Sequence, residues 1–277
     1  MKRRVLDRVR TARAWLFALT TGIVVLWTAL RPRFGQDPSY HRFADARTLL
    51  GVPNAFDVLS NVAFAAVGIA ALLFLARRPE AFVDRRERLP WLVLFVGVAL
   101  TSVGSAWYHL APDNTRLVWD RLPMTLGFMG LFAALLTERV SVRVGLALLP
   151  ALLLAGLTSV AYWHVTEAAG RGDLRPYSLV QFYPLLAIPL LLALFPARYT
   201  GAADLVVALA FYLAAKVAES YDAAIYGSGG IVSGHTLKHL LAAMGAWWLL
   251  RMLELRHGGG PRRPQGHSLD SDRHRHR

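Results

Sequence analysis

The sequence contains no cysteine, so a disulfide framework and every metal site built on thiolate ligands are excluded. Any metal ion would have to be bound by histidine and carboxylate side chains. Charged residues are also scarce, at 18% of the 277 residues, and the 18 Asp and Glu are fewer than the 31 Lys and Arg. A polar or charged side chain inside an apolar helix is costly, so the few that occur there need an explanation.

Long apolar runs, by contrast, are abundant. Hydrophobic residues make up 55% of the chain, the mean hydropathy is +0.38, and these residues gather in eight blocks. Each block is about long enough to cross the roughly 30 Å hydrocarbon core of a membrane as a helix. The pattern predicts an all-α fold, a polytopic membrane helix bundle. The blocks span residues 14–30, 57–76, 91–110, 119–137, 142–163, 177–195, 202–221 and 231–253.

Basic residues lie mostly between and beyond these blocks. With the N-terminus in the cytoplasm, the cytoplasmic segments hold 21 Lys and Arg and the opposite segments hold 7. This bias, with an even number of helices, predicts that both termini are cytoplasmic. The net charge of +13 is then explained by basic residues that set the orientation of the helices in the membrane. No nucleic-acid partner is expected, because no basic soluble domain is present. The richness in Ala, Leu and Arg indicates a bacterial protein, and hence the inner membrane.

The two ends of the chain differ from its centre. Residues 1–35 combine a basic N-terminus with the block 14–30, which lacks a clean cleavage site and is interpreted as a retained transmembrane helix rather than a signal peptide. Residues 255–277 are rich in Gly, Pro, Arg and His, which predicts a disordered basic tail. Residues 36–254 are left as the functional domain.

Three polar residues lie where two neighbouring blocks meet. Ser105 and His109 are four residues apart near the end of one block, so they project from one face of a helix. A turn then reverses the chain, and Asp120 opens the next block at about the same depth. We expect the three side chains to converge near the extracytoplasmic face. In the alternative, Ser105 bonds its own helix backbone and Asp120 caps its helix.

The last block begins with a second pair of spaced residues, His235 and His239. With His109 they offer three imidazoles beside a carboxylate, which is typical of a catalytic zinc site whose fourth position is left for water. A packing role for the histidine pair is the alternative. The cost of isolated polar groups within a membrane favours the metal site.

Together these motifs resemble the alkaline ceramidase family, within the CREST superfamily of seven-helix membrane hydrolases. The resemblance is carried by Ser105-x3-His109, by Asp120 eleven residues later, and by His235-x3-His239. It extends to the Asp-Val-Leu-Ser-Asn stretch at residues 57–61 and covers about residues 54–253. It implies a seven-helix ceramidase-like core, to which the helix at 14–30 is added as an extra N-terminal span.

The resemblance also implies an activity, the hydrolysis of the N-acyl amide bond of ceramide-like lipids to a free fatty acid and a long-chain base. His109, His235 and His239 would bind Zn²⁺, which lowers the pKa of a water molecule toward about 7. Asp120 would take the proton of this water and pass it to the leaving amine, while Ser105 would orient the water or donate to the oxyanion. The expected partners are the N-acyl lipid, whose physiological identity stays open, and the membrane lipids. The oligomeric state is also left open.

One departure from the family concerns calcium. Alkaline ceramidases place acidic and Asn residues in and before the first core helix to bind Ca²⁺, whereas the matching segment here offers only Asp37, Asp45 and Asn54. This departure argues against bound Ca²⁺. Asp45 and Arg47 either pair within an ordered lid or belong to a solvated loop, and the solvated loop is the favoured interpretation.

Other polar and aromatic residues near the block ends have more ordinary interpretations. Lys216 and Glu219 are predicted to neutralise each other, with Glu219 as a candidate to orient a zinc-bound imidazole. His164 and Glu167 are interpreted as membrane-interface residues. An interfacial aromatic belt accounts for Trp107, Tyr108, Trp119 and Trp163.

Two further functions are weighed against the hydrolase. A seven-helix receptor or sensor of the progestin and adiponectin receptor type would use similar residues to bind zinc, but the close spacing of His109 and Asp120 favours a ceramidase-like enzyme. A transporter with a histidine proton relay would place polar residues along a continuous path, whereas here they cluster at one end of the helices.

Overall fold

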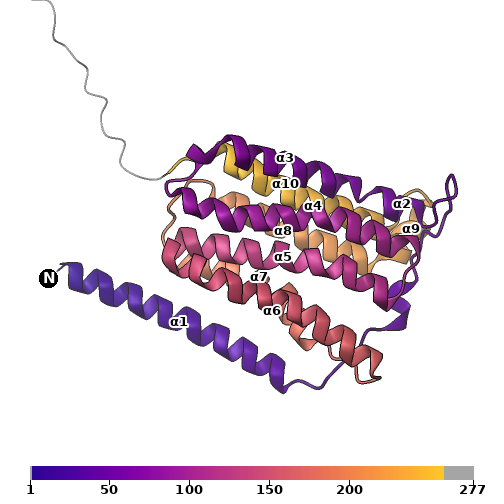
Figure 1. Cartoon of the computed structure of the whole chain (residues 1–277), viewed down its shortest axis with the longest axis horizontal. Coiled ribbons are helices and arrows are strands. Elements are labelled where there is room, and N and C mark those ends of the chain that lie inside the picture. The colour runs from indigo at the N-terminus through magenta and orange to yellow at the C-terminus, as the bar shows by residue number, and fades with distance from the viewer. Residues whose placement is uncertain (1, 259–277) are drawn as a thin grey trace, which may run out of the picture.

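The computed structural model of the chain describes residues 2–258, and within them it is entirely helical apart from loops and two isolated bridges (Figure 1). The all-α prediction is therefore confirmed. The α-helices are α1 (Lys2–Leu30), α2 (Ala55–Leu59), α3 (Val62–Arg77), α4 (Arg88–Leu110), α5 (Asn114–Arg139), α6 (Val142–Ala168), α7 (Arg175–Leu194), α8 (Ala202–Ser220), α9 (Asp222–Gly229) and α10 (Gly234–Leu255). Three short 3₁₀ helices span Pro38–His41, Pro79–Ala81 and Arg85–Glu87. Of the predicted tail, residues 255–277, the structure describes residues 255–258. The rest of the tail, residues 259–277, lies outside the described residues.

Five of the described helical segments are long and apolar enough to cross a membrane, which indicates a membrane protein. They are Arg8–Leu30, Ala55–Arg77, Arg85–Leu110, Val142–Ala168 and Arg175–Leu194. The helices α5, α8 and α10 run beside them, and each has charged residues within its length. These charges matter for the site described below, because several of them face the interior of the bundle.

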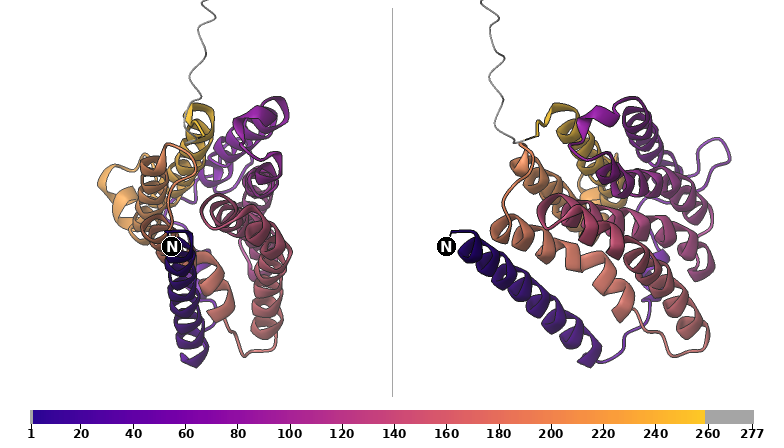
Figure 2. Two further views of the ribbon diagram at one scale, coloured as in Figure 1. Left: turned by 90° about the vertical axis from the view of Figure 1, so that its left-hand side faces the viewer. Right: turned by 60° about the vertical axis from the view of Figure 1, so that its left-hand side comes forward.

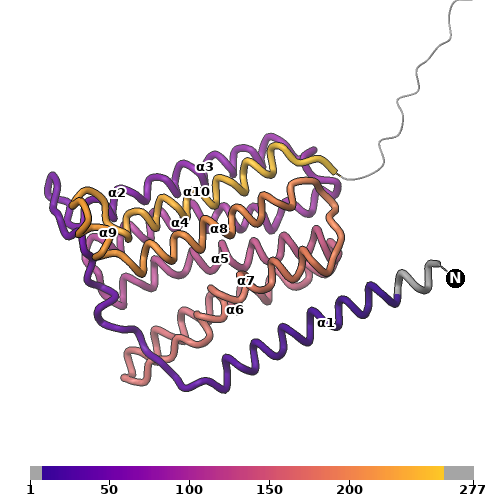
Figure 3. The backbone as a smooth tube through the Cα atoms, turned by 180° about the vertical axis from the view of Figure 1, so that it is seen from behind, coloured from indigo at the N-terminus to yellow at the C-terminus, as the bar shows by residue number. Residues whose placement is uncertain are grey.

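The helices α3 to α8 and α10 run side by side, and α1 lies obliquely along the outside (Figures 1 and 2). It contacts α7, where Arg175 donates to the backbone carbonyls of Ala29 and Arg31 at 2.7 and 2.8 Å, and Phe17 also packs against Phe132 of α5. The start of α1 and the end of α10 lie at one end of the bundle, and α2 and α9 lie at the other (Figure 3). The described chain ends therefore share one end of the molecule.

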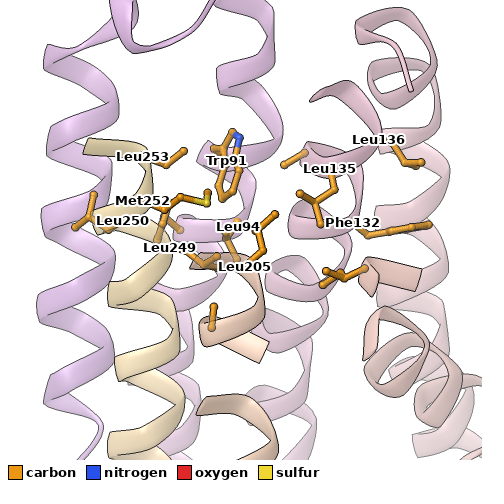
Figure 4. Packing of buried hydrophobic residues seen from close by; sticks show 14 of the residues in the cluster. Trp91, Leu94, Phe132, Leu135, Leu136, Leu205, Leu249, Leu250, Met252 and Leu253 are labelled. Carbon is orange, nitrogen blue, oxygen red and sulfur yellow. The ribbon is translucent and has the colours of Figure 1, made fainter. Parts of the chain in front are cut away.

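A cluster of buried apolar side chains fills the end of the bundle where the chain ends lie. Trp91 and Leu94 of α4 meet side chains from α5, α8 and α10 there (Figure 4). The indole of Trp91 donates to the carboxylate of Glu138 at 2.8 Å, which satisfies its polar atom. Apolar packing therefore dominates this end of the bundle, and charged side chains within it pair with one another, Arg256 with Glu138 and Arg198 with Glu87.

The close approach of α4 and α5 depends on a glycine. A Cβ atom at Gly104 would overlap the backbone carbonyl of Trp119, so only glycine allows the two backbones to lie this close. Ser105 and Asp120 are the next residues along the two helices. The absence of one side chain therefore brings the two predicted catalytic residues together.

The helix ends differ from the prediction where side chains bond the backbone. The helix α5 starts at Asn114 rather than at residue 119, because the carboxylate of Asp113 accepts from the backbone N–H of Arg116 at 2.7 Å and caps it. The predicted helix 57–76 is broken after α2, where Ser60 and Asn61 both donate to the carbonyl of Asp57. The helix α9 was not predicted.

We predict that Gly104→Ala lowers the free energy of unfolding by about 1 to 3 kcal/mol, because the added methyl group forces α4 and α5 apart. The matched control is Gly127→Ala, where the nearest atom to an added Cβ is Leu94 Cδ1 at 3.9 Å and the cost is small. Thermal unfolding in detergent, followed by tryptophan fluorescence, measures both. Equal melting temperatures for the two variants would contradict the proposed role of Gly104.

Candidate metal centre

Three histidines meet at the end of the bundle opposite the chain ends. His109 lies at the end of α4, and His235 and His239 lie on the first turns of α10. Their ring centroids are 4.8, 4.9 and 5.0 Å apart, and one ring nitrogen of each lies within 4.8 Å of the others. Their exposed fractions are 0, 4 and 2%. The predicted convergence of these three residues is confirmed.

The start of α10 is fixed by several contacts that place His235 and His239. Ser233 caps the helix by accepting from the backbone N–H of Thr236 at 3.0 Å. Asp222 accepts from the backbone N–H of His235 at 2.7 Å, and a side chain at Gly234 would overlap the carbonyl of Ala218. These contacts fix the register of α10 against α8 and α9.

The ring nitrogens of the three histidines fit a metal ion. Both ring nitrogens of His109 are buried without a hydrogen-bond partner within the described residues. In His239, Nδ1 lies 2.8 Å from Ser60 Oγ, so Nε2 is available to bind a metal ion. In His235, Nε2 lies 3.2 Å from Lys238 Nζ, so Nδ1 is available. Each imidazole thus keeps a nitrogen for coordination. Three imidazoles suit a divalent transition metal such as zinc, and the donor set alone fits several such ions.

A loop between α1 and α2 covers the histidines from outside. Phe43 packs its ring 4.6 Å from that of His109 and 4.5 Å from that of His235. Asp45 is 1% exposed and pairs with Arg47 through bonds of 2.8 and 2.7 Å, so the favoured interpretation of a solvated loop was wrong. These bonds hold the pKa of Asp45 below its usual value. Arg47 also donates to the carbonyl of Ile231 at 2.7 Å, which fastens the loop beside the start of α10.

Ser105 and Asp120 lie together beside this cluster. Both side chains are buried, at 2 and 6% exposed, and the Ser105 hydroxyl bonds the Asp120 carboxylate. Asp120 lies well inside α5, and Asp113 is the capping residue, so the alternative in which Asp120 caps the helix is excluded. Both residues line the same cavity as His239.

That cavity lies in the interior of the bundle and has a volume of about 370 Å³. It lies between α4, α5, α7, α8 and α10. Charged side chains line the end near the histidines, and the rest of its wall is largely apolar. The apolar part includes Leu94, Met124, Phe128, Leu131, Ile188, Leu205, Leu209 and Leu249.

Glu219 and Lys216 pair as predicted, but Glu219 also has a second role. Its carboxylate accepts from Lys238 Nζ at 2.8 Å and from the hydroxyl of Tyr40 at 3.2 Å. Lys238 in turn contacts His235, so Glu219 reaches that imidazole only through Lys238. The group that contacts the imidazole of His239 is instead Ser60.

Sequence reasoning missed Lys238, Ser60 and Arg121 as site residues. Lys238 and Arg121 are basic residues within apolar blocks, which is a signal that could have identified them. Ser60 was noted only as part of the family-like stretch at residues 57–61. Its bond to His239 depends on the break between α2 and α3, which no sequence pattern predicted.

Some residues assigned to the membrane interface instead face the interior. Tyr108 and Trp163 are 1 and 0% exposed, so they do not belong to an aromatic belt, whereas Trp107 and Trp119 are exposed as predicted. Glu167 accepts from the backbone N–H of Gln36 at 2.9 Å and thereby holds the loop that follows α1.

Comparison with known proteins does not identify a family. No protein-family model matches the chain, and a search of curated proteins finds no match. The function is therefore argued from the site itself.

We predict that the purified protein binds about one metal ion per chain, and that His109→Ala, His235→Ala and His239→Ala each abolish binding, because three ligands are needed to hold it. The control is His257→Ala, which changes an exposed histidine at the opposite end of the bundle. Elemental analysis measures the metal content. Metal retained by all three variants would exclude this cluster as the site.

A second prediction concerns the residue that contacts His239. Ser60→Ala is expected to weaken metal binding about tenfold or more, because a ligand imidazole loses the partner that orients it. The matched control is Ser102→Ala, since Ser102 bonds only its own helix, at the carbonyl of Ala99. Competition with a chelator of known affinity gives the metal dissociation constant of each variant. Equal dissociation constants would show that Ser60 does not orient His239.

Proposed function

We propose that the protein is an integral membrane, zinc-dependent amide hydrolase that cleaves the N-acyl bond of ceramide-like lipids, as the resemblance to alkaline ceramidases implies. The products are a free fatty acid and a long-chain base. One observation carries the proposal. Three buried histidines with free ring nitrogens lie beside a buried Ser–Asp pair at the polar end of an otherwise apolar cavity.

The shape of the cavity supports a lipid substrate. An acyl chain would occupy the apolar part between α4, α5, α7, α8 and α10, where its burial is favourable. The amide would then lie at the polar end, near Ser105, Asp120 and His239. Polar groups at only one end of the cavity fit a lipid held by its tail, and they do not form the continuous path that a proton-relay transporter requires.

The residues present supply the steps of amide hydrolysis. Zn²⁺, when held by His109, His235 and His239, would provide a Lewis acid and a water of lowered pKa. Asp120 accepts the proton of the attacking water and delivers it to the amine nitrogen as the C–N bond breaks, because an amide anion is too basic to leave. Ser105, bonded to Asp120, either orients the water or donates to the oxyanion.

The membrane arrangement that we propose has eight spans, with α1 added to a seven-helix core. Both termini are cytoplasmic and the metal centre lies near the extracytoplasmic face of a bacterial inner membrane. The distribution of Lys and Arg supports this orientation. It is also supported by the position of the described chain ends at the end of the bundle opposite the histidines.

A zinc-containing receptor is the second candidate, and turnover distinguishes it from the enzyme. We predict that Asp120→Asn keeps its metal but loses about 100-fold or more in the rate of fatty-acid release from an N-acyl sphingosine, because the group that moves the proton is gone. The matched control is Asp113→Asn, which changes the exposed cap of the same helix and should keep its rate. Full activity of Asp120→Asn would contradict its role, and metal binding by the wild type without release of fatty acid would favour the receptor.

A further inference from the structure

Arg121 is a buried residue with a hydrogen-bond donor that has no partner among the described residues. The residue follows Asp120 on α5, is 5% exposed and lines the cavity. Its guanidinium carbon lies 4.2 Å from the ring centroid of Trp163 and 4.6 Å from that of Tyr177, and Nη2 donates to Gln36 Oε1 at 2.5 Å. Nη1 is buried without a hydrogen-bond partner within the described residues. An arginine is always charged, so this donor needs an acceptor.

The other charges of the cavity do not neutralise Arg121. Among the described residues that line the cavity, three side chains are basic and two are acidic. Glu219 is engaged by Lys216 and Lys238, and no carboxylate within residues 8–258 forms an ion pair with Arg121. The aromatic rings stabilise the cation only in part. One positive charge in a desolvated cavity thus remains unmatched, which predicts an anionic ligand.

The free donor favours a carboxylate over a phosphate. Nη1 is a single NH₂ group, and its neighbours are already occupied, Nη2 by Gln36 and Lys238 by Glu219. A phosphate group presents three oxygen atoms that would need further donors, whereas a carboxylate presents two, which the two N–H bonds of one NH₂ group come closer to satisfying. Gln36 is itself held by Glu167 through its backbone N–H, so Arg121 is fixed in position before a ligand binds.

We infer that Arg121 binds the carboxylate of the lipid, and that the substrates are therefore N-acyl amino acids, in which an acidic group lies next to the amide. This inference rests on the proposed amide hydrolysis and replaces the ceramide-like lipid by an N-acyl amino acid, so that the second product is an amino acid in place of a long-chain base. Arg121 and Asp120 both line the cavity, and in the inferred complex the amide faces Asp120 while the carboxylate, one carbon from the amide nitrogen, meets Arg121. A neutral N-acyl sphingosine would leave Nη1 without a charged partner.

Binding tests this inference without depending on turnover. The ligand is the methylene isostere of N-palmitoylglycine, in which a CH₂ group replaces the amide N–H so that hydrolysis is impossible. Its neutral counterpart has a hydroxymethyl group in place of the carboxylate. The wild-type protein in detergent is expected to bind the acidic isostere at least about tenfold more tightly, since a hydrogen bond to a charged group contributes about that much. Arg121→Gln is expected to lose this preference and to bind the neutral isostere as the wild type does.

Two controls make the result specific. Arg116→Gln changes an arginine on the same helix that donates to the carbonyl of Trp107, outside the cavity, and should keep the preference. Arg121→Lys keeps the positive charge and should retain part of the preference for the acidic isostere. It provides a second variant if Arg121→Gln does not fold. Palmitate serves as the third ligand, because a fatty-acid product also carries a carboxylate.

The outcomes separate this inference from the proposed function. Equal affinity of the wild type for the two isosteres, or a preference that survives in Arg121→Gln, would overturn the inference even if the protein hydrolyses an N-acyl sphingosine. An equal loss of palmitate affinity in Arg121→Gln would assign the carboxylate site to the product and overturn the substrate class. A preference that depends on Arg121 would support the inference even in a protein without measurable hydrolysis.

Discussion

The structure depends on one constraint, that polar groups inside an apolar helix bundle need partners. Most of those at the polar end of the cavity have one: Glu219 binds two lysines, Asp120 binds Ser105, and Ser60 contacts His239. Among the described residues near this end, the ring nitrogens of His109 and Nη1 of Arg121 have none, and neither do Oδ2 of Asp57 and Oδ1 of Asn61. The His109 nitrogens fit a metal ion and the Arg121 donor fits an anion. Both lie where a lipid amide would react, so these two unsatisfied groups define the function that we propose.

Helix packing places these groups. Gly104 lets α4 and α5 lie close enough for Ser105 to bond Asp120, and Gly234 lets α10 start against the end of α8, which sets the position of His235. The loop after α1 then covers the site. Phe43 packs against the rings of His109 and His235, and the side chain of Gln36 accepts a hydrogen bond from Arg121. The site thus combines rigid helix ends with a loop fastened by hydrogen bonds to Glu167, Asp222 and Ile231, an arrangement that preorganises its groups.

The sequence was sufficient to predict the helical class and the three histidines, because apolar blocks and a four-residue spacing are local patterns. It was not sufficient where the outcome depends on tertiary contacts. Asp45 is buried beneath Arg47, which reaches across to the carbonyl of Ile231, and Trp163 faces inward, where it packs against Arg121. Of the 31 basic residues, three were assigned to neither side of the membrane, and those three, Arg121, Lys216 and Lys238, all line the cavity.

The central claim is that the histidine cluster and Asp120 perform metal-dependent amide hydrolysis. The most direct measurement is fatty-acid release by the purified wild-type protein from N-palmitoylsphingosine and N-palmitoylglycine, before chelation, after chelation, and after readdition of Zn²⁺. The account predicts release that disappears with the chelator and returns with zinc, with N-palmitoylglycine the better substrate if Arg121 binds its carboxylate. Absence of release from both amides by fully metal-loaded protein would contradict it.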